Sequence, residues 1–169
     1  MKIITTPDPR LREKSEKVTK IDDEILGIIE NMRKLSLDWE KEHPYELSAA
    51  MAAPQMGANK RIIIVRDDMA DKSKATFTAL INPEVIKAEG KIIRDFEGCL
   101  SVPNKAGMVT RPNYVKARAF NEDMEEYEIE GTELLARAIC HELDHLDGHL
   151  YVEKVEGELM DATYDEDEE

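Results

Sequence analysis

Apolar residues recur at intervals of three and four positions in two stretches of the chain, from residue 22 to about residue 39 and from residue 132 to residue 148. This spacing places them on one face of an α-helix in each stretch. Asp22 and Thr132 can cap the helix starts, and Gly148 is typical of a position just beyond a helix end. The residues expected to face the core are Ile25, Ile28, Ile29, Met32, Leu35, Leu135, Ala138, Ile139 and Leu146. We therefore expect two amphipathic helices, one early and one late.

Strand patterns fill the region between the two helices. We expect extended segments at residues 61–66, 77–85, 91–101, 114–120 and 126–130. The last two should form a hairpin around residues 121–123. Pro83 lacks a backbone donor and should stop the second strand, whereas the polar stretch 38–48, interrupted by Pro44, should be a loop. Strands followed by one late helix predict an α+β fold, with mixed or antiparallel sheets packed around that helix.

The composition is that of a soluble globular chain. It has 169 residues, of which 41% are hydrophobic and 36% charged, and its mean hydropathy is −0.52. No apolar run approaches the roughly 18 residues of a membrane helix, and the first residues do not resemble a signal peptide. Two cysteines cannot make a disulfide framework. We expect a cytoplasmic protein with no membrane partner.

Negative charge is concentrated near the C-terminus. The formal net charge is −14, and residues 152–169 contain nine acidic residues and one lysine, or −8, which leaves −6 for the other residues. We expect one domain at residues 1–162 and an acidic, disordered tail at residues 163–169. Such a charge repels nucleic-acid phosphates, so direct binding to nucleic acid is not expected.

The late helix carries two histidines with the spacing of metal ligands. His141 and His145 are four residues apart, so both imidazoles lie on one helical face, with Glu142 beside them to move protons. A metal held by two histidines needs a third ligand, and a catalytic site leaves the next position to water. The pattern therefore predicts a metal centre whose third ligand lies elsewhere in the chain.

Several residues could supply that third ligand. Cys140 directly precedes the first histidine, which turns it about 100° off the ligand face and favours a packing role. His149 lies beyond the expected helix end, and His43 lies in a polar segment where solvation is the simpler interpretation. Cys99 follows Gly98, which lets the backbone come close to a neighbour. On these residues alone, Cys99 is as consistent with a core position as with a ligand.

Three segments resemble the three motifs of the peptide deformylase family. They are residues 49–57 (AAMAAPQMG), 97–101 (EGCLS) and 141–148 (HELDHLDG). Residues 7–12, 21–24 and 80–83 also match the usual run of that family. The likeness covers residues 3–155, which is nearly the whole chain, and the three motifs together are highly specific.

This resemblance implies a hydrolase that removes the formyl group from N-formyl-methionyl peptides or nascent chains and releases formate. It implies one divalent metal ion on Cys99, His141 and His145. In that family the ion is usually Fe(II) in the cell, and zinc, nickel or cobalt can occupy the site. Glu142 would take a proton from the attacking water and return it to the departing amine.

The resemblance also implies the groups that surround the reacting carbonyl. The side-chain amide of Gln55 and the backbone N–H of Leu100 would stabilise the developing oxyanion. Substrate contacts would come from Ala50, Met51 and Gly98.

The chain departs from the family pattern around the first motif. Ser48 and Ala50 stand where the family normally has glycines, and the stretch before them is longer than usual. Their Cβ atoms could narrow the substrate cleft; alternatively, the longer loop moves this strand outward and the added groups only fill space. Cys140 replaces a usual glutamine, and Lys105 could stand in for an absent arginine.

Two other functions stay open at this point. One is a related amidase that acts on another N-formyl or N-acyl substrate, and the other is a metal-binding paralogue with weak turnover. A zinc endoprotease is less consistent, because its third ligand would lie downstream, where only His149 or the acidic tail is available.

The acidic tail leads to a first prediction. In some bacterial members of the family a C-terminal helix helps the enzyme dock on the ribosome, whose surface is largely anionic RNA. Residues 152–169 carry a net charge of −8 here, so docking through this segment is not expected. Removal of residues 163–169 should leave activity on a free formyl-peptide unchanged and should not weaken co-sedimentation with ribosomes. A clear loss of co-sedimentation at physiological salt would contradict this.

Overall fold

The computed structural model describes residues 2–162, so the acidic tail predicted for residues 163–169 lies outside the described residues. Its helices and strands are α1 (Asp23–Glu42), β1 (Ala50–Ala52), β2 (Ile62–Arg66), β3 (Phe77–Cys99), β4 (Val102–Phe120), β5 (Glu126–Thr132), α2 (Glu133–Leu146) and β6 (Met160–Asp161). Short 3-10 helices lie at Pro9–Arg12, Ala53–Met56 and Tyr151–Lys154. In this part of the chain the strands form one antiparallel sheet in the order β1-β2-β3-β4-β5, with β6 paired to β4. The predicted α+β fold is confirmed.

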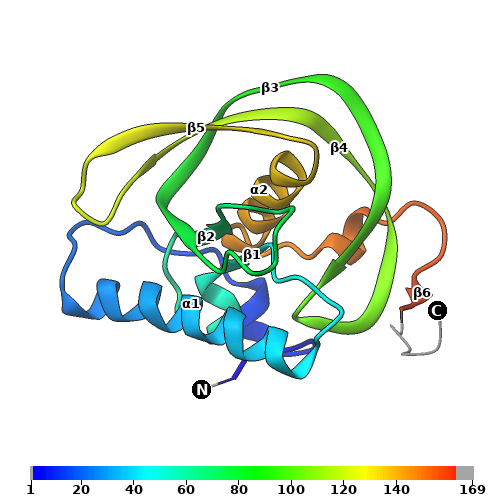
Figure 1. Ribbon diagram of the computed structural model, residues 1–169, viewed down its shortest axis with the longest axis horizontal. Helices are drawn as coiled ribbons and strands as arrows, with labels where there is room; N and C mark the ends of the chain where they lie inside the picture. Colours follow the sequence, from blue (N-terminus) through cyan, green and yellow to red (C-terminus); the bar gives the residue numbers. More distant parts are fainter. Residues whose placement is uncertain (1, 163–169) are drawn as a thin grey trace.

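At strand β2 the sheet lies between the two helices. Ile62 and Ile64 belong to the core on the α1 side, whereas Ile63 and Val65 belong to the core on the α2 side. A strand that is buried on both faces needs apolar residues at every position, which explains the uninterrupted run in β2. Figure 1 shows α1 along one side of the molecule and α2 in its middle, enclosed by the curved ribbon of β3 and β4.

Helix α1 starts as expected but ends later. The Asp22 carboxylate accepts a hydrogen bond from the Ile25 N–H at 3.2 Å, which is an N-cap. The helix continues to Glu42, so residues 40–42, which were expected to lie in a loop, are helical. It ends at His43, the residue before Pro44, because a proline disfavours helical geometry at the position that precedes it.

The expectation that Pro83 ends a strand is wrong. β3 passes through Pro83 and pairs with β4 on both sides of it. The pairing register shifts between Ile81 and Glu84, and Asn82 has a left-handed backbone with φ of 50°. Pro83 therefore lies in a bulge, where no ladder donor is required of it. The Asn82 amide stabilises the bulge through hydrogen bonds with both backbone groups of Val18.

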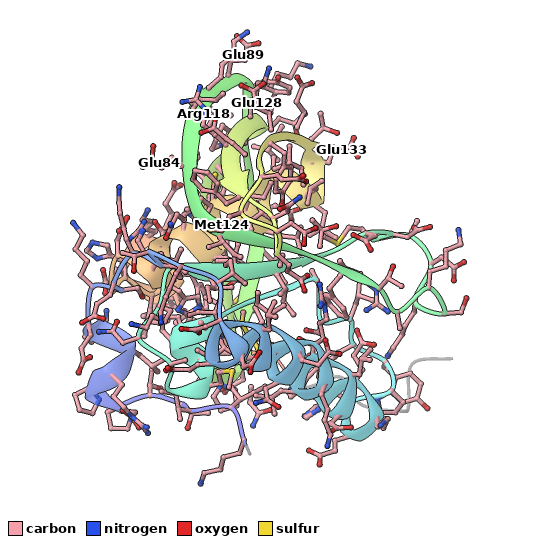
Figure 2. All side chains as sticks on the ribbon, turned by 90° about the vertical axis from the view of Figure 1, so that its left-hand side faces the viewer. Glu84, Glu89, Arg118, Met124, Glu128 and Glu133 are labelled. Atoms are coloured by element: carbon pink, nitrogen blue, oxygen red, sulfur yellow. The ribbon has the colours of Figure 1, made fainter. Side chains whose placement is uncertain are left out.

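β3 and β4 form a long curved ribbon whose outward bend carries charged residues. Glu89 lies at this bend, in the middle of β3 and opposite Tyr114 of β4, with Arg118 and Glu128 below it in the view of Figure 2. The predicted hairpin between residues 114–120 and 126–130 is present as β4 and β5, although β4 begins much earlier, at Val102. The ribbon encloses α2 on its inner side (Figure 1). None of the helices in residues 2–162 is long and apolar enough to span a membrane.

The boundaries of α2 are those that the sequence predicts. Thr132 is its N-cap residue, and Gly148 follows it with φ of 79°. A Cβ atom at Gly148 would overlap the carbonyl oxygen of Arg12, so glycine is required there both for its backbone and for the close approach of the N-terminal segment. The apolar face of α2 packs on the sheet through Ala138, Ile139 and Leu146. Both histidines are also on the buried side of this helix.

Candidate active site

The end of β3 and the middle of α2 bring three metal-ligand side chains together. One ligand atom each from Cys99, His141 and His145 lies within 4.8 Å of the other two. The Cys99 sulfur is 3.2 Å from Nε2 of His145. Both histidines are buried and Cys99 is half-buried. A thiolate and two imidazoles form a donor set that suits several borderline divalent metals, including zinc and iron.

A buried carboxylate orients the first histidine. Oε1 of Glu97 is 2.5 Å from Nδ1 of His141, which leaves Nε2 of that ring for a metal. Glu97 also accepts hydrogen bonds from Arg111 at 2.7 and 3.1 Å and from Arg137 at 2.9 Å. Burial tends to raise the pKa of Glu97, but the hydrogen bonds from His141 and Arg111 outweigh it and hold the pKa well below its usual value. Glu97 is therefore a buried anion beside the ligands.

No function was expected of Glu97 from the sequence, although this residue begins the second motif. Arg111 and Arg137 were likewise missed, because β4 and α2 bring them to Glu97 only in the folded chain. The signal that could have found the cluster is a carboxylate two residues before a ligand cysteine, since metal-bound histidines commonly pair with such a group.

Glu142 lies next to the ligands with one oxygen free. Among the described residues, its Oε2 atom is buried without a hydrogen-bond partner, and so is Nδ1 of His145. Burial raises the pKa of Glu142 to about 7, against the opposing effect of His141. The unpartnered oxygen of Glu142, buried beside three ligand atoms, is a group that the water of a bound ion would satisfy. The residues present therefore fit a metal centre.

Gln55 is held with its amide toward the cysteine. Its Oε1 accepts a hydrogen bond from the Ala52 N–H at 2.9 Å, so the NH₂ group faces the other way. That group lies 3.2 Å from the Ser101 hydroxyl and 3.6 Å from the Cys99 sulfur. Leu100 follows the cysteine and lines the same cleft. Both predicted oxyanion residues therefore lie beside the metal ligands.

A cleft of about 420 Å³ leads to these residues. Residues 43 and 45–50 line one side of it, and residues 96–100 and 102–106 line another. α2 contributes His141, Glu142, Arg137, Ala138 and Leu134. An extended peptide end can therefore reach Glu142 and Cys99 from the surface.

Two of the three predicted substrate contacts line this cleft. Ala50 and Gly98 are among its lining residues. The side chain of Met51 is completely buried in the core on the α1 side and lies beside the Ser36 hydroxyl, so it does not face the cleft, contrary to expectation. The reason is strand geometry, because neighbouring residues of β1 point to opposite faces of the sheet.

The remaining ligand candidates lie away from the three-residue cluster. Cys140 is half-buried and packs against the α2 core, and burial raises the pKa of its thiol. His149 is exposed, with its Nδ1 3.0 Å from Glu153. His43 is not merely solvated as expected, because its ring stacks on Trp39 with centroids 4.2 Å apart.

The comparisons with known proteins agree with this geometry. The model of the polypeptide deformylase family matches residues 1–159. The chain belongs to this family. A peptide deformylase of Agathobacter rectalis is 52% identical over 163 residues, which cover 96% of this chain and 94% of the relative.

Solved deformylase structures have the same fold. The peptide deformylase of Synechococcus elongatus in complex with actinonin has a TM-score of 0.81 and 33% identity, over 92% of this chain and 80% of that chain. The enzyme of Thermotoga maritima has a TM-score of 0.80 and 29% identity, over 92% of this chain and 97% of that chain. The prediction of a peptide deformylase, a hydrolase of N-formylated peptides, is confirmed.

The ligand cluster leads to a prediction with an internal control. Cys99→Ala removes the thiolate and should abolish stoichiometric metal in protein purified without oxygen, as measured by elemental analysis. Cys140→Ala removes the other cysteine, which packs against the core, and should keep the metal. Full metal content in a folded Cys99→Ala protein would contradict the assignment.

Proposed function

We propose that this deformylase holds one divalent ion on Cys99, His141 and His145 and that the ion is Fe(II) in the cell. The observation that supports this ligand set is the approach of the three ligand atoms to within 4.8 Å beside the cleft, whereas the choice of Fe(II) comes from the resemblance to the family. Zinc, nickel and cobalt suit the same donor set. When bound, such an ion lowers the pKa of a water towards about 7 and so supplies a hydroxide near neutral pH.

Glu142 is the proposed proton carrier. Its unpartnered oxygen is buried beside the ligands, and the residue lines the cleft that admits the substrate. From this position it can accept the proton of the attacking water and then donate a proton to the departing amine. The products are formate and a peptide with a free N-terminal methionine.

Gln55 and Leu100 are the proposed donors to the oxyanion. The Gln55 amide is held by the Ala52 N–H, so its NH₂ group needs no reorganisation when charge develops on the formyl oxygen. The backbone N–H of Leu100 would approach from the other motif. Loss of one such donor costs about 2.7–4 kcal/mol of transition-state stabilisation in other enzymes.

The free edge of β1 is the proposed guide for the substrate backbone. In the described residues β1 pairs only with β2, and Ala50 of β1 lines the cleft. An extended peptide can add to such an open edge through main-chain hydrogen bonds. This would direct the formyl end toward the metal ligands, with Gly98 on the opposite side of the path.

The proposed place of action is the cytoplasm, on newly made chains, with residues 1–162 as the catalytic domain. Direct binding to nucleic acid is not part of the proposal. Even without residues 152–169 the chain has a net charge of −6, which repels nucleic-acid phosphates. Turnover of formyl-Met-Ala-Ser by iron-loaded protein tests the substrate assignment. Absence of turnover in a protein with full iron would favour a shifted substrate or a binding role.

The role of Glu142 leads to a prediction. Glu142→Gln keeps the shape and hydrogen-bonding capacity of the side chain but removes the base. It should therefore lower kcat by at least about 10²-fold, the scale of general acid–base catalysis, with metal content and thermal stability close to those of the parent. Near-normal kcat in this variant would mean that another group moves the proton.

Ala50 leads to a second prediction. Ala50 is only 7% exposed and belongs to the core cluster on the α2 side. Its methyl group therefore fills space beside the cleft and does not narrow the cleft. Ala50→Gly should leave KM for formyl-Met peptides unchanged. It should lower Tm, because glycine within a strand costs about 0.5–1 kcal/mol of stability. A several-fold fall in KM would show instead that the methyl group obstructs the substrate.

A further inference from the structure

The mouth of the cleft carries three large and exposed apolar side chains. Tyr45 is 66% exposed, Phe96 is 54% exposed and Leu134 is 46% exposed, and all three line the cleft that contains the metal ligands. They come from three separate parts of the chain: the segment after α1, the end of β3 and the start of α2. Exposed apolar side chains gathered around one opening indicate a binding surface.

One lysine binds three backbone carbonyls of the segment that carries Tyr45. The ammonium group of Lys72 donates to the carbonyl oxygens of His43 at 3.4 Å, Pro44 at 2.7 Å and Glu46 at 2.5 Å. These three carbonyls flank Tyr45 on both sides. One cation thus fixes a stretch of irregular backbone that belongs to no helix or strand.

A buried ion pair fixes Lys72 and the far end of the same segment. Arg66 of β2 donates to the backbone carbonyl of Lys72 at 2.7 Å and to the Glu40 carboxylate at 3.1 Å. Glu40 in turn accepts a hydrogen bond from the Ser48 N–H at 2.8 Å. Arg66 is completely buried and Glu40 nearly so, so the pair is shielded from solvent. The segment from residue 43 to residue 48 is therefore anchored at both ends and in the middle.

We infer that Tyr45, positioned by Lys72, forms with Phe96 and Leu134 an apolar mouth that selects substrates with large apolar side chains directly after formyl-methionine. This inference rests on the proposed function. Tyr45, Phe96 and Leu134 are exposed and line the same cleft as Cys99 and Glu142. When the formyl group of a peptide lies at these two residues, the residues after its methionine extend toward the exposed part of the cleft and meet the three side chains. The occupant of the apolar surface is thus the downstream part of the substrate.

The selectivity is measured with two peptides of equal length, formyl-Met-Leu-Phe and formyl-Met-Ser-Ser. KM of the parent enzyme should be on the order of tenfold lower for the apolar peptide, the size of effect that a modest change in apolar contact produces. Values of kcat should be similar, because the groups beside the formyl carbon are the same for both. Equal KM for the two peptides would overturn the inference, whereas absence of turnover on both would count against the proposed function itself.

Two variants test the residues, and two others serve as controls. Tyr45→Ser should bring the ratio of the two KM values close to one, with the metal content unchanged. Lys72→Met should reduce the ratio in the same direction, because Tyr45 is then no longer held at the mouth. Lys72→Arg, which can still donate to several carbonyls, should restore the preference. Lys74→Met alters a second lysine between β2 and β3, which is paired with Asp68 and not with the segment that carries Tyr45. This variant should leave the KM ratio unchanged.

The outcomes separate a positioning role from a merely structural one. A fall in Tm for Lys72→Met with an unchanged KM ratio would overturn the role given to Lys72. A preference that survives Tyr45→Ser would overturn the apolar mouth.

Discussion

The buried carboxylate of Glu97 connects the three elements that make the metal site. It lies near the end of β3, two residues before Cys99, and it pairs with Arg111 of β4, Arg137 of α2 and His141 of α2. An anion in the interior is stable only with such partners, and loss of one partner from a buried pair typically costs about 3–5 kcal/mol. The same contacts that neutralise Glu97 therefore set the distance between the cysteine on the sheet and the histidines on the helix.

The arginines extend this cluster into the surrounding structure. Arg111 also binds Asp144 of α2 at 2.7 Å, and Arg137 donates to the carbonyls of Val109 and Ile93 at 2.9 Å. Helix α2 is thus joined to the enclosing β3–β4 ribbon by ionic contacts as well as by its apolar face (Figure 1). A ligand set that spans a helix and a strand needs this rigidity, because metal affinity falls when the ligands are free to separate.

The other wall of the cleft depends on a second buried ion pair. Glu40 and Arg66 join α1 to β2, and the Arg66 guanidinium also lies over the Phe77 ring at 5.3 Å. Glu40 also accepts a hydrogen bond from the Ser48 N–H, and Arg66 donates one to the Lys72 carbonyl; both backbone groups lie in irregular segments. Regular secondary structure satisfies backbone groups internally, whereas these segments rely on charged side chains to do so. The longer stretch before β1 is therefore an ordered wall of the cleft.

The sequence by itself determined the elements whose causes are local. The helix limits at Asp22 and Gly148 follow from capping and glycine geometry, and the i, i+4 spacing placed His141 and His145 on one face of α2. The resemblance to the family then supplied the proposed roles of Cys99 and Gln55.

Tertiary structure decided what depends on distant partners. Pro83 lies within β3 because Asn82 bonds to Val18, and α1 extends beyond residue 39 because Glu40 finds Arg66 and Ser48 elsewhere in the chain. The direction of each side chain of β1 also depends on which face meets which helix, so Ala50 lies beside the cleft and Met51 in the core. The position of Glu97 among its arginines required the closed fold as well. Local patterns do not encode these contacts, since each joins residues that are far apart in the chain and adjacent only after folding.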